Sequence, residues 1–294
     1  CTVVSWTLKT VFDLGRVSNL PTVWTNTLAG VILAGASPAD WRILVLLLSM
    51  TLAYTGGMFL NDAFDAAIDA RERSERPIPS GKVSAFSVSV YGYLMLVISV
   101  ILVALCAYSN EGGAWKAILS AIALACAIIL YNAWHKANPL SPLIMGLCRM
   151  LVYITAAYTV TSTPTSMVFI GALVLLSYLI GLTFTAKQEN LGRVKNLWPL
   201  LFLAAPMVFA VNILPTQPNV LWPLLLFTLW LVVALRFILR RQTGDIPRAV
   251  VSMIAGISLI DAMFIASSSN LIWASIAVVG FLATLVLQKW VSGT

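Results

Sequence analysis

The sequence predicts an all-α protein that crosses a membrane many times. Hydrophobic residues make up 60% of the chain and charged residues only 10%, and the mean hydropathy is +0.93. Soluble proteins carry roughly 25% charged residues, whereas a transmembrane helix needs about 20 mostly apolar residues in a row. Because apolar runs near that length recur along the whole chain, we expect a polytopic helical bundle of nine or ten transmembrane helices around a central cavity.

Ten apolar runs are candidate spans. They cover residues 20–36, 42–60, 86–108, 114–131, 141–161, 166–185, 197–213, 219–239, 248–267 and 271–290. The first run is short and contains Pro21, and the last two are joined by a tight turn at 268–270. The loops between the runs are too short to hold a second domain, so residues 1–294 are predicted to form a single integral membrane domain.

The basic residues fall almost entirely on one side of this predicted topology. With a cytoplasmic N-terminus, all but Arg42, Lys116 and Arg149 of the eighteen Lys and Arg residues lie in or beside inner loops. This bias is the positive-inside pattern of membrane proteins. It accounts for the net charge of +7 without a nucleic-acid partner. We expect a multi-pass protein of the bacterial inner membrane, with a cavity open to the cytoplasmic face.

The cysteines and the single histidine exclude two other classes of site. Cys106, Cys126 and Cys148 lie in apolar runs without the spacing of a zinc site or a disulfide framework. Because His135 is the only histidine, a multi-histidine metal site is excluded. Residues 1–18 are predicted to be a cytoplasmic leader.

The segment FLNDAFDAAIDARERSERPIPSG, residues 59–81, concentrates acidic residues at the end of the second apolar run. Asp62, Asp65 and Asp69 are spaced i, i+3 and i+7, which places three carboxylates on one face of a helix. Like charges on one face require a positive partner. Mg²⁺ prefers carboxylate oxygens and completes its shell with water and substrate phosphates, so a magnesium–diphosphate site is one interpretation.

Two other interpretations of these aspartates stay open. They can pair with Arg71, Arg73 and Arg76 on a solvated helix end, where ion pairs contribute little. They can also carry ions in a coupled transporter, although such acids usually lie near the bilayer midplane on broken helices. The position of the aspartates at the inner end of the run favours the diphosphate site.

The same segment resembles the first motif of the UbiA superfamily of intramembrane prenyltransferases. The matching positions are Asn61, Asp62, Asp65, Asp69, Arg73, Arg76, Pro77 and Gly81. The resemblance implies an enzyme that uses Mg²⁺ to transfer a prenyl group from a polyprenyl diphosphate, through an allylic carbocation, to an acceptor. It also implies nine helices, metal ligation by Asp62, Asp65 and Asp69, and diphosphate binding by Asn61, Arg73 and Arg76.

Later landmarks of the superfamily appear in the same order. Tyr131 corresponds to its Tyr-x-x-x-Lys element, but His135 stands at the lysine position and Lys136 comes one residue later. The resemblance gives Tyr131 a catalytic role, through cation–π stabilisation of the carbocation, and either His135 or Lys136 a contact with the diphosphate, with Lys136 favoured. Gly146 and Arg149 resemble a Gly-x-x-Arg element, which implies that Arg149 faces the cavity and binds substrate.

The second acidic motif of the superfamily is thinned in TFTAKQENLGRVKN, residues 183–196. Glu189 is the only acidic residue there, and it is a candidate ligand of a shared metal ion. Lys187 is a candidate to bind the diphosphate in place of a second Mg²⁺. This departure keeps a catalytically inactive family member among the alternatives.

The first apolar run adds a polar candidate. Asn19 stands where UbiA-like proteins place an asparagine that faces the cavity, and GRVSNLPTVWTN resembles the EboC-like branch. Asp261, an acidic residue within an apolar run, either pairs with Arg149 or lines the cavity. The acceptor and the prenyl chain length are not predicted by any of these residues.

Overall fold

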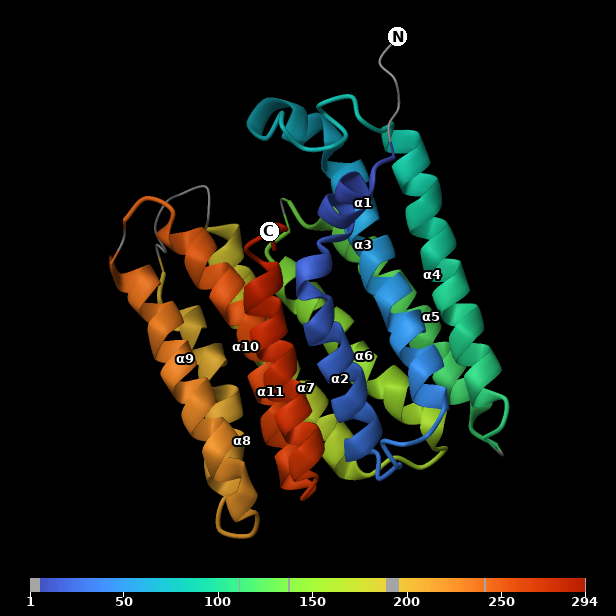
Figure 1. Cartoon of the computed structure of the whole chain (residues 1–294), viewed down its shortest axis with the longest axis vertical. Helices are drawn as coiled ribbons and strands as arrows, with labels where there is room; N and C mark the ends of the chain where they lie inside the picture. Colours follow the sequence, from blue (N-terminus) through green and yellow to red (C-terminus); the bar gives the residue numbers. More distant parts are fainter. Residues whose placement is uncertain (1–5, 111, 137, 189–195, 241, 294) are drawn as a thin grey trace.

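The computed structural model describes residues 6–110, 112–136, 138–188, 196–240 and 242–293, and the regular elements within these ranges are all helices (Figure 1). The α-helices are α1 (Leu8–Gly15), α2 (Leu20–Leu33), α3 (Arg42–Glu72), α4 (Ala85–Ala107), α5 (Ala114–Trp134), α6 (Ser141–Val160), α7 (Ser166–Lys187), α8 (Ala205–Ile213), α9 (Leu221–Arg240), α10 (Asp245–Ser267) and α11 (Leu271–Leu287). The 3₁₀ turns η1 (Val17–Asn19), η3 (Trp198–Ala204) and η4 (Pro218–Val220) lead into α2, α8 and α9.

The helices confirm the all-α prediction. In the described part of the chain, seven helical segments are long and apolar enough to cross a membrane: α3, α4, α5, α6, α7, η4 with α9, and α10. The apolar segments Trp198–Ile213 and Leu271–Leu287 are shorter. Each of the ten predicted runs coincides with a helix or with a 3₁₀ turn and its helix, while the number of crossings, nine or ten, stays a prediction. The chain is an integral, multi-pass membrane protein.

Different segments of the chain lie at the two ends of the bundle (Figure 1). One end carries α1, the segment that follows α3, and the end of the chain after α11. At the other end, the Arg42 guanidinium donates to Asp40, to Oδ1 of Asn110 at 2.6 Å and to the Thr159 carbonyl at 3.5 Å. These bonds join the connection before α3, the connection after α4 and the last turn of α6, and the hydrogen bond from Arg42 lowers the pKa of Asp40.

Helix ends follow local capping rules. The Thr7 hydroxyl accepts from the Thr10 amide at 3.1 Å and starts α1, and Ser84 starts α4 in the same way. Arg16 ends α1 in the left-handed region, with φ 42° and ψ 51°, which a residue other than glycine rarely adopts. Residues 8–15 were expected to be part of a leader. They form a helix, and the burial of Leu14 and Gly15 shows that this helix packs on the bundle.

Helix α3 is the longest and carries the site. Its 31 residues span about 46 Å at 1.5 Å per residue, more than the roughly 30 Å hydrocarbon core. It therefore extends beyond the predicted run, which ended at residue 60. Gly56 and Gly92 let α3 and α4 approach closely, since a Cβ on Gly56 would lie 2.8 Å from the Gly92 carbonyl oxygen.

Candidate active site

A cavity of about 240 Å³ lies inside the bundle, between α2, α3, α5, α6, α7 and α10. Its wall is mostly apolar, with side chains such as Met50, Leu124, Leu179 and Ile254. Polar side chains gather at one end, and they are Arg16, Asn19, Asn61, Tyr131 and Asn132. The cavity therefore suits a ligand with a long apolar part and a polar head.

The aspartates stand beside this polar end, on the last turns of α3. The side chains of Asp62, Asp65 and Asp69 are only 7%, 7% and 5% exposed. Asp62 lies 20 residues beyond the start of α3, which corresponds to about 30 Å along the helix axis. This distance places the carboxylates at the edge of the hydrocarbon core rather than at its midplane.

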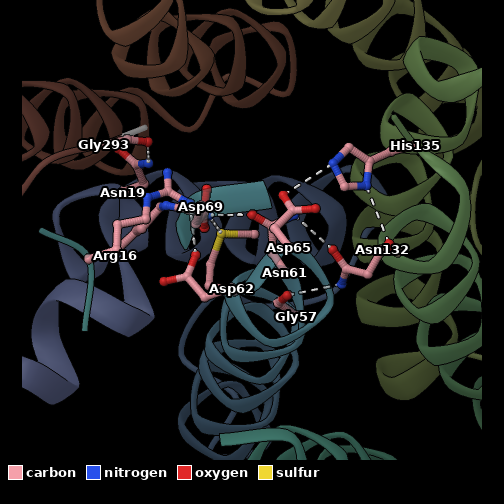
Figure 2. Close-up of polar contacts among 12 residues, drawn as sticks. Arg16, Asn19, Gly57, Asn61, Asp62, Asp65, Asp69, Asn132, His135 and Gly293 are labelled. Carbon is pink, nitrogen blue, oxygen red and sulfur yellow. Dashed lines mark hydrogen bonds and ion pairs between the residues drawn. The ribbon is translucent and has the colours of Figure 1, made fainter. Parts of the chain in front are cut away.

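Two arginines neutralise Asp62 and Asp69. Arg16 Nη2 lies 3.0 Å from Asp62 Oδ1, and Arg76 Nη1 lies 3.3 Å from the same oxygen and 2.8 Å from Asp69 Oδ2. Arg76 reaches both aspartates because the chain turns where α3 ends: Arg73 leaves the helical region with φ −143° and ψ 60°, and the Arg76 amide donates to the Arg73 carbonyl at 3.1 Å. Figure 2 shows Arg16, Asp62 and Asp69 together on one side of α3.

Asp65 points toward the end of α5 rather than toward α1 (Figure 2). His135 Nε2 lies 3.4 Å and Lys136 Nζ 3.2 Å from Asp65 Oδ2. The structure thus brings both candidates for the lysine position to the same carboxylate. The Tyr131 ring stacks on the His135 ring, with centroids 5.0 Å apart, so Tyr131 is fixed between the cavity and Asp65.

A chain of amides links the motif to α5. Arg16 Nη1 donates to Asn61 Oδ1 at 3.2 Å, Asn61 Nδ2 donates to Asn132 Oδ1 at 3.1 Å, and Asn132 Nδ2 donates to the Gly57 carbonyl at 3.0 Å. Arg16 Nη1 also contacts the Met58 sulfur at 3.0 Å. These bonds fix the rotamer of Asn61 at the mouth of the cavity.

Asn19 lies at the same polar end. Its Nδ2 donates to the Tyr54 hydroxyl at 3.2 Å and to the Gly293 carbonyl at 2.9 Å, and its Oδ1 accepts from Gln288 at 3.2 Å. The segment after α11 is therefore held against η1 and forms part of the cavity wall.

Arg149 lines the cavity farther in. It donates to Asn26 Oδ1 at 2.8 Å and to the Thr22 hydroxyl at 3.1 Å, and its guanidinium lies 5.6 Å from the centre of the Tyr54 ring. Asn26 Nδ2 in turn donates to Asp261 at 2.8 Å. The sequence left two roles open for Asp261: pairing with Arg149 or lining the cavity. In the structure Asp261 is fully buried and is connected to Arg149 through Asn26.

Comparison of the sequence with protein families identifies the family of this chain. The model of the UbiA prenyltransferase family matches residues 23–268. The chain belongs to this family. Its resemblance to the superfamily, inferred from the aspartate motif, is confirmed.

Individual UbiA-type relatives agree with this assignment. The chain is 29% identical over 133 residues to digeranylgeranylglyceryl phosphate synthase of Methanothrix thermoacetophila, covering 45% of the chain and 47% of the relative. It is 26% identical over 230 residues to protoheme IX farnesyltransferase of Chloroflexus aurantiacus, covering 72% of the chain and 37% of the relative. The chain thus spans less than half the length of these relatives.

Solved structures show the same fold. One solved structure comes from work on the biosynthesis of digeranylgeranylglyceryl phosphate synthase in membranes. It superposes on this chain with a TM-score of 0.62 at 18% sequence identity, and the superposition covers 89% of this chain and 98% of the other. A UbiA homologue from Archaeoglobus fulgidus bound to GPP and Mg²⁺ gives a TM-score of 0.53 at 15% identity, with 90% and 99% coverage. At these identities the likeness concerns the fold.

The UbiA-type motif residues are not all brought together. Arg73 ends α3, with its amide donating to the Asp69 carbonyl at 2.8 Å, and it lines a polar pocket with Arg76. Lys187 Nζ donates to the Asn138 carbonyl at 2.7 Å and the Ser141 hydroxyl at 2.8 Å, rather than to an aspartate. Glu189, the predicted additional metal ligand, lies outside the described residues.

Three residues of the site were missed by the sequence analysis: Arg16, Tyr54 and Asn132. Arg16 was assigned to a leader, and nothing in the sequence indicated that it meets Asp62, 46 residues later. Asn132 carried a weak signal, since it is an amide beside Tyr131 at the end of an apolar run. Tyr54 carried none within its apolar surroundings.

The donors at this site fit a divalent cation that a substrate helps to hold. No group of three or more His, Cys, Asp or Glu side chains in the described ranges is close enough to enclose a metal ion by itself. Mg²⁺ needs only one or two carboxylates when phosphate oxygens and water supply its other ligands. Asp62, Asp65 and Asp69 offer such carboxylates beside a cavity, with cations already arranged on both sides of α3.

Proposed function

We propose that this chain transfers a prenyl group from a polyprenyl diphosphate to an acceptor within the membrane. The observation that carries the proposal is the row of buried carboxylates beside the polar end of a mostly apolar cavity. The apolar wall suits the prenyl tail, and the polar end suits the diphosphate. We further propose that residues 1–294 act as one integral membrane domain. This domain would lie in the inner membrane of a bacterium, with the aspartate end facing the cytoplasm.

The diphosphate head is assigned to the aspartate end. Asp62, Asp65 and Asp69 would hold Mg²⁺, with Glu189 as a further predicted ligand. When bound, Mg²⁺ neutralises negative charge that develops on the leaving diphosphate. Arg16, Arg76 and Lys136 already lie within 3.3 Å of aspartate oxygens, so a small side-chain movement lets their N–H groups bind phosphate oxygens instead.

Five other residues complete the substrate contacts of the proposal. Asn19 and Asn61 supply amides at the mouth of the cavity, and Arg73 adds a guanidinium at the end of α3. Arg149 supplies a buried guanidinium farther in, and Lys187 an ammonium at the end of α7. The membership of this chain in the EboC-like branch also stays a prediction.

The reaction breaks the bond between C1 of the prenyl chain and the bridging diphosphate oxygen. The electron pair leaves with the diphosphate, and an allylic carbocation remains in the cavity. The ring of Tyr131, which lines the cavity, stabilises this positive charge by a cation–π contact. The apolar wall keeps water from C1, so the acceptor forms the new bond to C1 and then loses a proton.

The comparisons support the donor more than the acceptor. The Archaeoglobus homologue was solved with GPP or DMAPP and Mg²⁺, a prenyl diphosphate in each case. The relatives named digeranylgeranylglyceryl phosphate synthase and protoheme IX farnesyltransferase imply different acceptors. The proposal therefore leaves the acceptor open, and the alternatives of an ion-coupled transporter and of an inactive family member become outcomes of the test.

The test is prenyl diphosphate binding to the protein in lipid nanodiscs. Labelled farnesyl and geranylgeranyl diphosphate are titrated with and without Mg²⁺ against the wild type, Asp65→Asn and Glu72→Gln. We expect binding that requires Mg²⁺, weakens at least about tenfold in Asp65→Asn through loss of a charged ligand, and is unchanged in Glu72→Gln, an exposed acid on the same helix.

Three results would contradict the proposal. Equal binding by the wild type and Asp65→Asn would remove the aspartates from the site. Absence of binding, together with aspartate-dependent ion flux across the bilayer, would favour a transporter. Mg²⁺-dependent binding without cleavage of the C1–O bond, for any acceptor offered, would favour an inactive member.

A further inference from the structure

The segment that follows α11, residues 288–293, crosses the polar end of the central cavity. Helix α11 ends at Leu287, and beyond it Gly293 lines the cavity together with Asn19. We call residues 288–293 the strap. The strap has a buried side and an exposed side: the buried residues are Val291 and Gly293, and the exposed ones are Lys289, Trp290 and Ser292.

The strap bridges two parts of the cavity wall. Gln288 Nε2 donates to Asn19 Oδ1, at the start of α2, at 3.2 Å and to the Val251 carbonyl of α10 at 3.2 Å. The Gly293 carbonyl accepts from Asn19 Nδ2 at 2.9 Å (Figure 2). On this side of the polar end, the strap therefore joins the start of α2 to α10.

These contacts occupy a side chain that is assigned to the substrate. Asn19 Nδ2 donates one hydrogen to the Tyr54 hydroxyl and the other to the Gly293 carbonyl, while its Oδ1 accepts from Gln288. An amide nitrogen has two hydrogens to donate, and both are engaged. A substrate oxygen can therefore accept a hydrogen bond from Asn19 only when one of these partners withdraws.

The strap is the partner that can withdraw at the lower cost. Tyr54 lies within the long helix α3, and α11 is closely packed, since a Cβ on Gly280 would lie 2.7 Å from Cγ2 of Thr25. The strap lies outside regular helix, and its bonds to Asn19 join neutral groups, which contribute less than the ion pairs around the aspartates. Segments with many exposed residues and few buried contacts open locally at low free energy. The hinge is therefore expected just after α11.

We propose that the strap is a gate of the central cavity. Bound to Asn19, it closes the polar end between α2 and α10; released, it lets a substrate oxygen replace the Gly293 carbonyl as the acceptor from Asn19. The inference rests on the proposed function, which assigns Asn19 to the substrate.

The first experiment measures opening without any substrate. Cys148 lines the cavity, so it is kept as the only cysteine of the full chain in nanodiscs, and its rate of reaction with a water-soluble methanethiosulfonate is recorded. We expect Gln288→Ala to raise this rate at least about fivefold, the effect of one lost hydrogen bond. Gly293→Val should act likewise, because a Cβ on Gly293 would lie 3.0 Å from Asn19 Oδ1. Lys289→Ala, an exposed position in the strap, is the matched control and should react at the parent rate.

The second experiment locks the strap in place. A Cβ on Gly293 would lie 3.4 Å from Cγ1 of Val251, and a cysteine sulfur takes the position of that carbon, so a disulfide can join the two positions. In a cysteine-free background, we expect oxidised Val251→Cys/Gly293→Cys to bind labelled farnesyl diphosphate with Mg²⁺ at least about tenfold more slowly than after reduction. The two single variants, treated with the same oxidant, are the controls.

The gate and the proposed function fail in different ways. Unchanged labelling of Cys148 in both Gln288→Ala and Gly293→Val would overturn the gate, and so would equal association rates of the oxidised and reduced double variant. Absence of Mg²⁺-dependent binding by the wild type would instead contradict the prenyltransferase proposal, and the labelling of Cys148 would still decide whether the strap opens the cavity.

Discussion

Each of the three aspartates on α3 meets at least one cation, although all three come from one helix face. Asp62 meets Arg16 and Arg76, Asp69 shares Arg76, and Asp65 meets Lys136 and His135. A buried carboxylate without a partner is strongly unfavourable, and these contacts explain how three can coexist with side chains at most 7% exposed. The same contacts surround the predicted metal position with N–H donors.

Substitutions of Tyr131 test whether its ring or its hydroxyl group acts at this site. Because a cation–π contact uses the face of the ring, Tyr131→Phe is expected to keep prenyl transfer within about threefold of the wild type. Tyr131→Leu removes the ring and also the stacking on His135, and we expect the turnover rate to fall at least about tenfold. The measurement is single-turnover cleavage of labelled prenyl diphosphate. Equal losses in both variants would assign the role to the hydroxyl.

At the scale of elements, a buried polar cluster joins α2, α6 and α10. Asp261 of α10 accepts from Thr25 at 2.6 Å, from Asn26 at 2.8 Å and from the Tyr153 hydroxyl, and Asn26 accepts from Arg149. Because the donors and acceptors come from three helices, the cluster fixes their rotation about their own axes. The orientation of the Arg149 guanidinium in the cavity wall follows from that rotation.

Asp261→Leu would leave Arg149 buried without a negative charge nearby. Removing one partner of a buried charged network is expected to destabilise the protein by about 3 kcal/mol. Adding Arg149→Met should recover part of that loss, since replacing both charges by apolar groups is often nearly neutral. Thermal unfolding in nanodiscs measures the change, with Ser252→Ala on the same helix as control. A double variant less stable than Asp261→Leu would contradict a coupled network.

At the scale of the whole molecule, the chemistry is gathered at one end. The aspartates lie on the last turns of α3 and the cavity has its polar end beside them, at the end of the bundle that carries α1 and the segment after α3 (Figure 1). Asp40, Arg42 and Asn110 are joined at the opposite end. In the proposed reaction, a water-soluble diphosphate would then enter and leave from a single side of the membrane. The positive-inside pattern predicts that this side is the cytoplasmic one.

Cysteine labelling tests this orientation. In a cysteine-free background, Ser74→Cys lies after α3 and Ser109→Cys lies after α4, and both native residues are exposed. In intact cells, we expect a membrane-impermeant maleimide to label Ser109→Cys and to label Ser74→Cys only after permeabilisation. The reverse pattern would place the aspartates outside the cytoplasm. Thr163→Cys, an exposed position in another connection at the same end as Ser109, provides a matched control.

Much of the fold followed from the sequence because apolar length largely determines where membrane helices form. The ten runs coincide with helices, and the i, i+3, i+7 spacing placed Asp62, Asp65 and Asp69 on one face. Helix α3 continues past the apolar run to Glu72, as the helical spacing of the aspartates indicated, since a helix can continue after its apolar run ends.

Contacts between distant segments could not be inferred in this way. Arg16 reaches Asp62 only because α1 packs beside α3, and its own surroundings in the sequence resemble a polar leader. The choice between His135 and Lys136 depends on the geometry of the end of α5, where the structure brings both to Asp65. Lys187 is held by Asn138 and Ser141, which no spacing rule indicated.

The left-handed backbone at Arg16 has a consequence for how this protein can evolve. Glycine would adopt φ 42° without the steric cost of about 1–2 kcal/mol that other residues incur there, so backbone strain alone favours losing the arginine. Its guanidinium, however, contacts Asp62, Asn61 and Met58 at once. Because removing one partner of a buried ion pair costs about 3 kcal/mol, more than the strain relieved, sequence libraries selected only for thermal tolerance are expected to retain an arginine at this strained position.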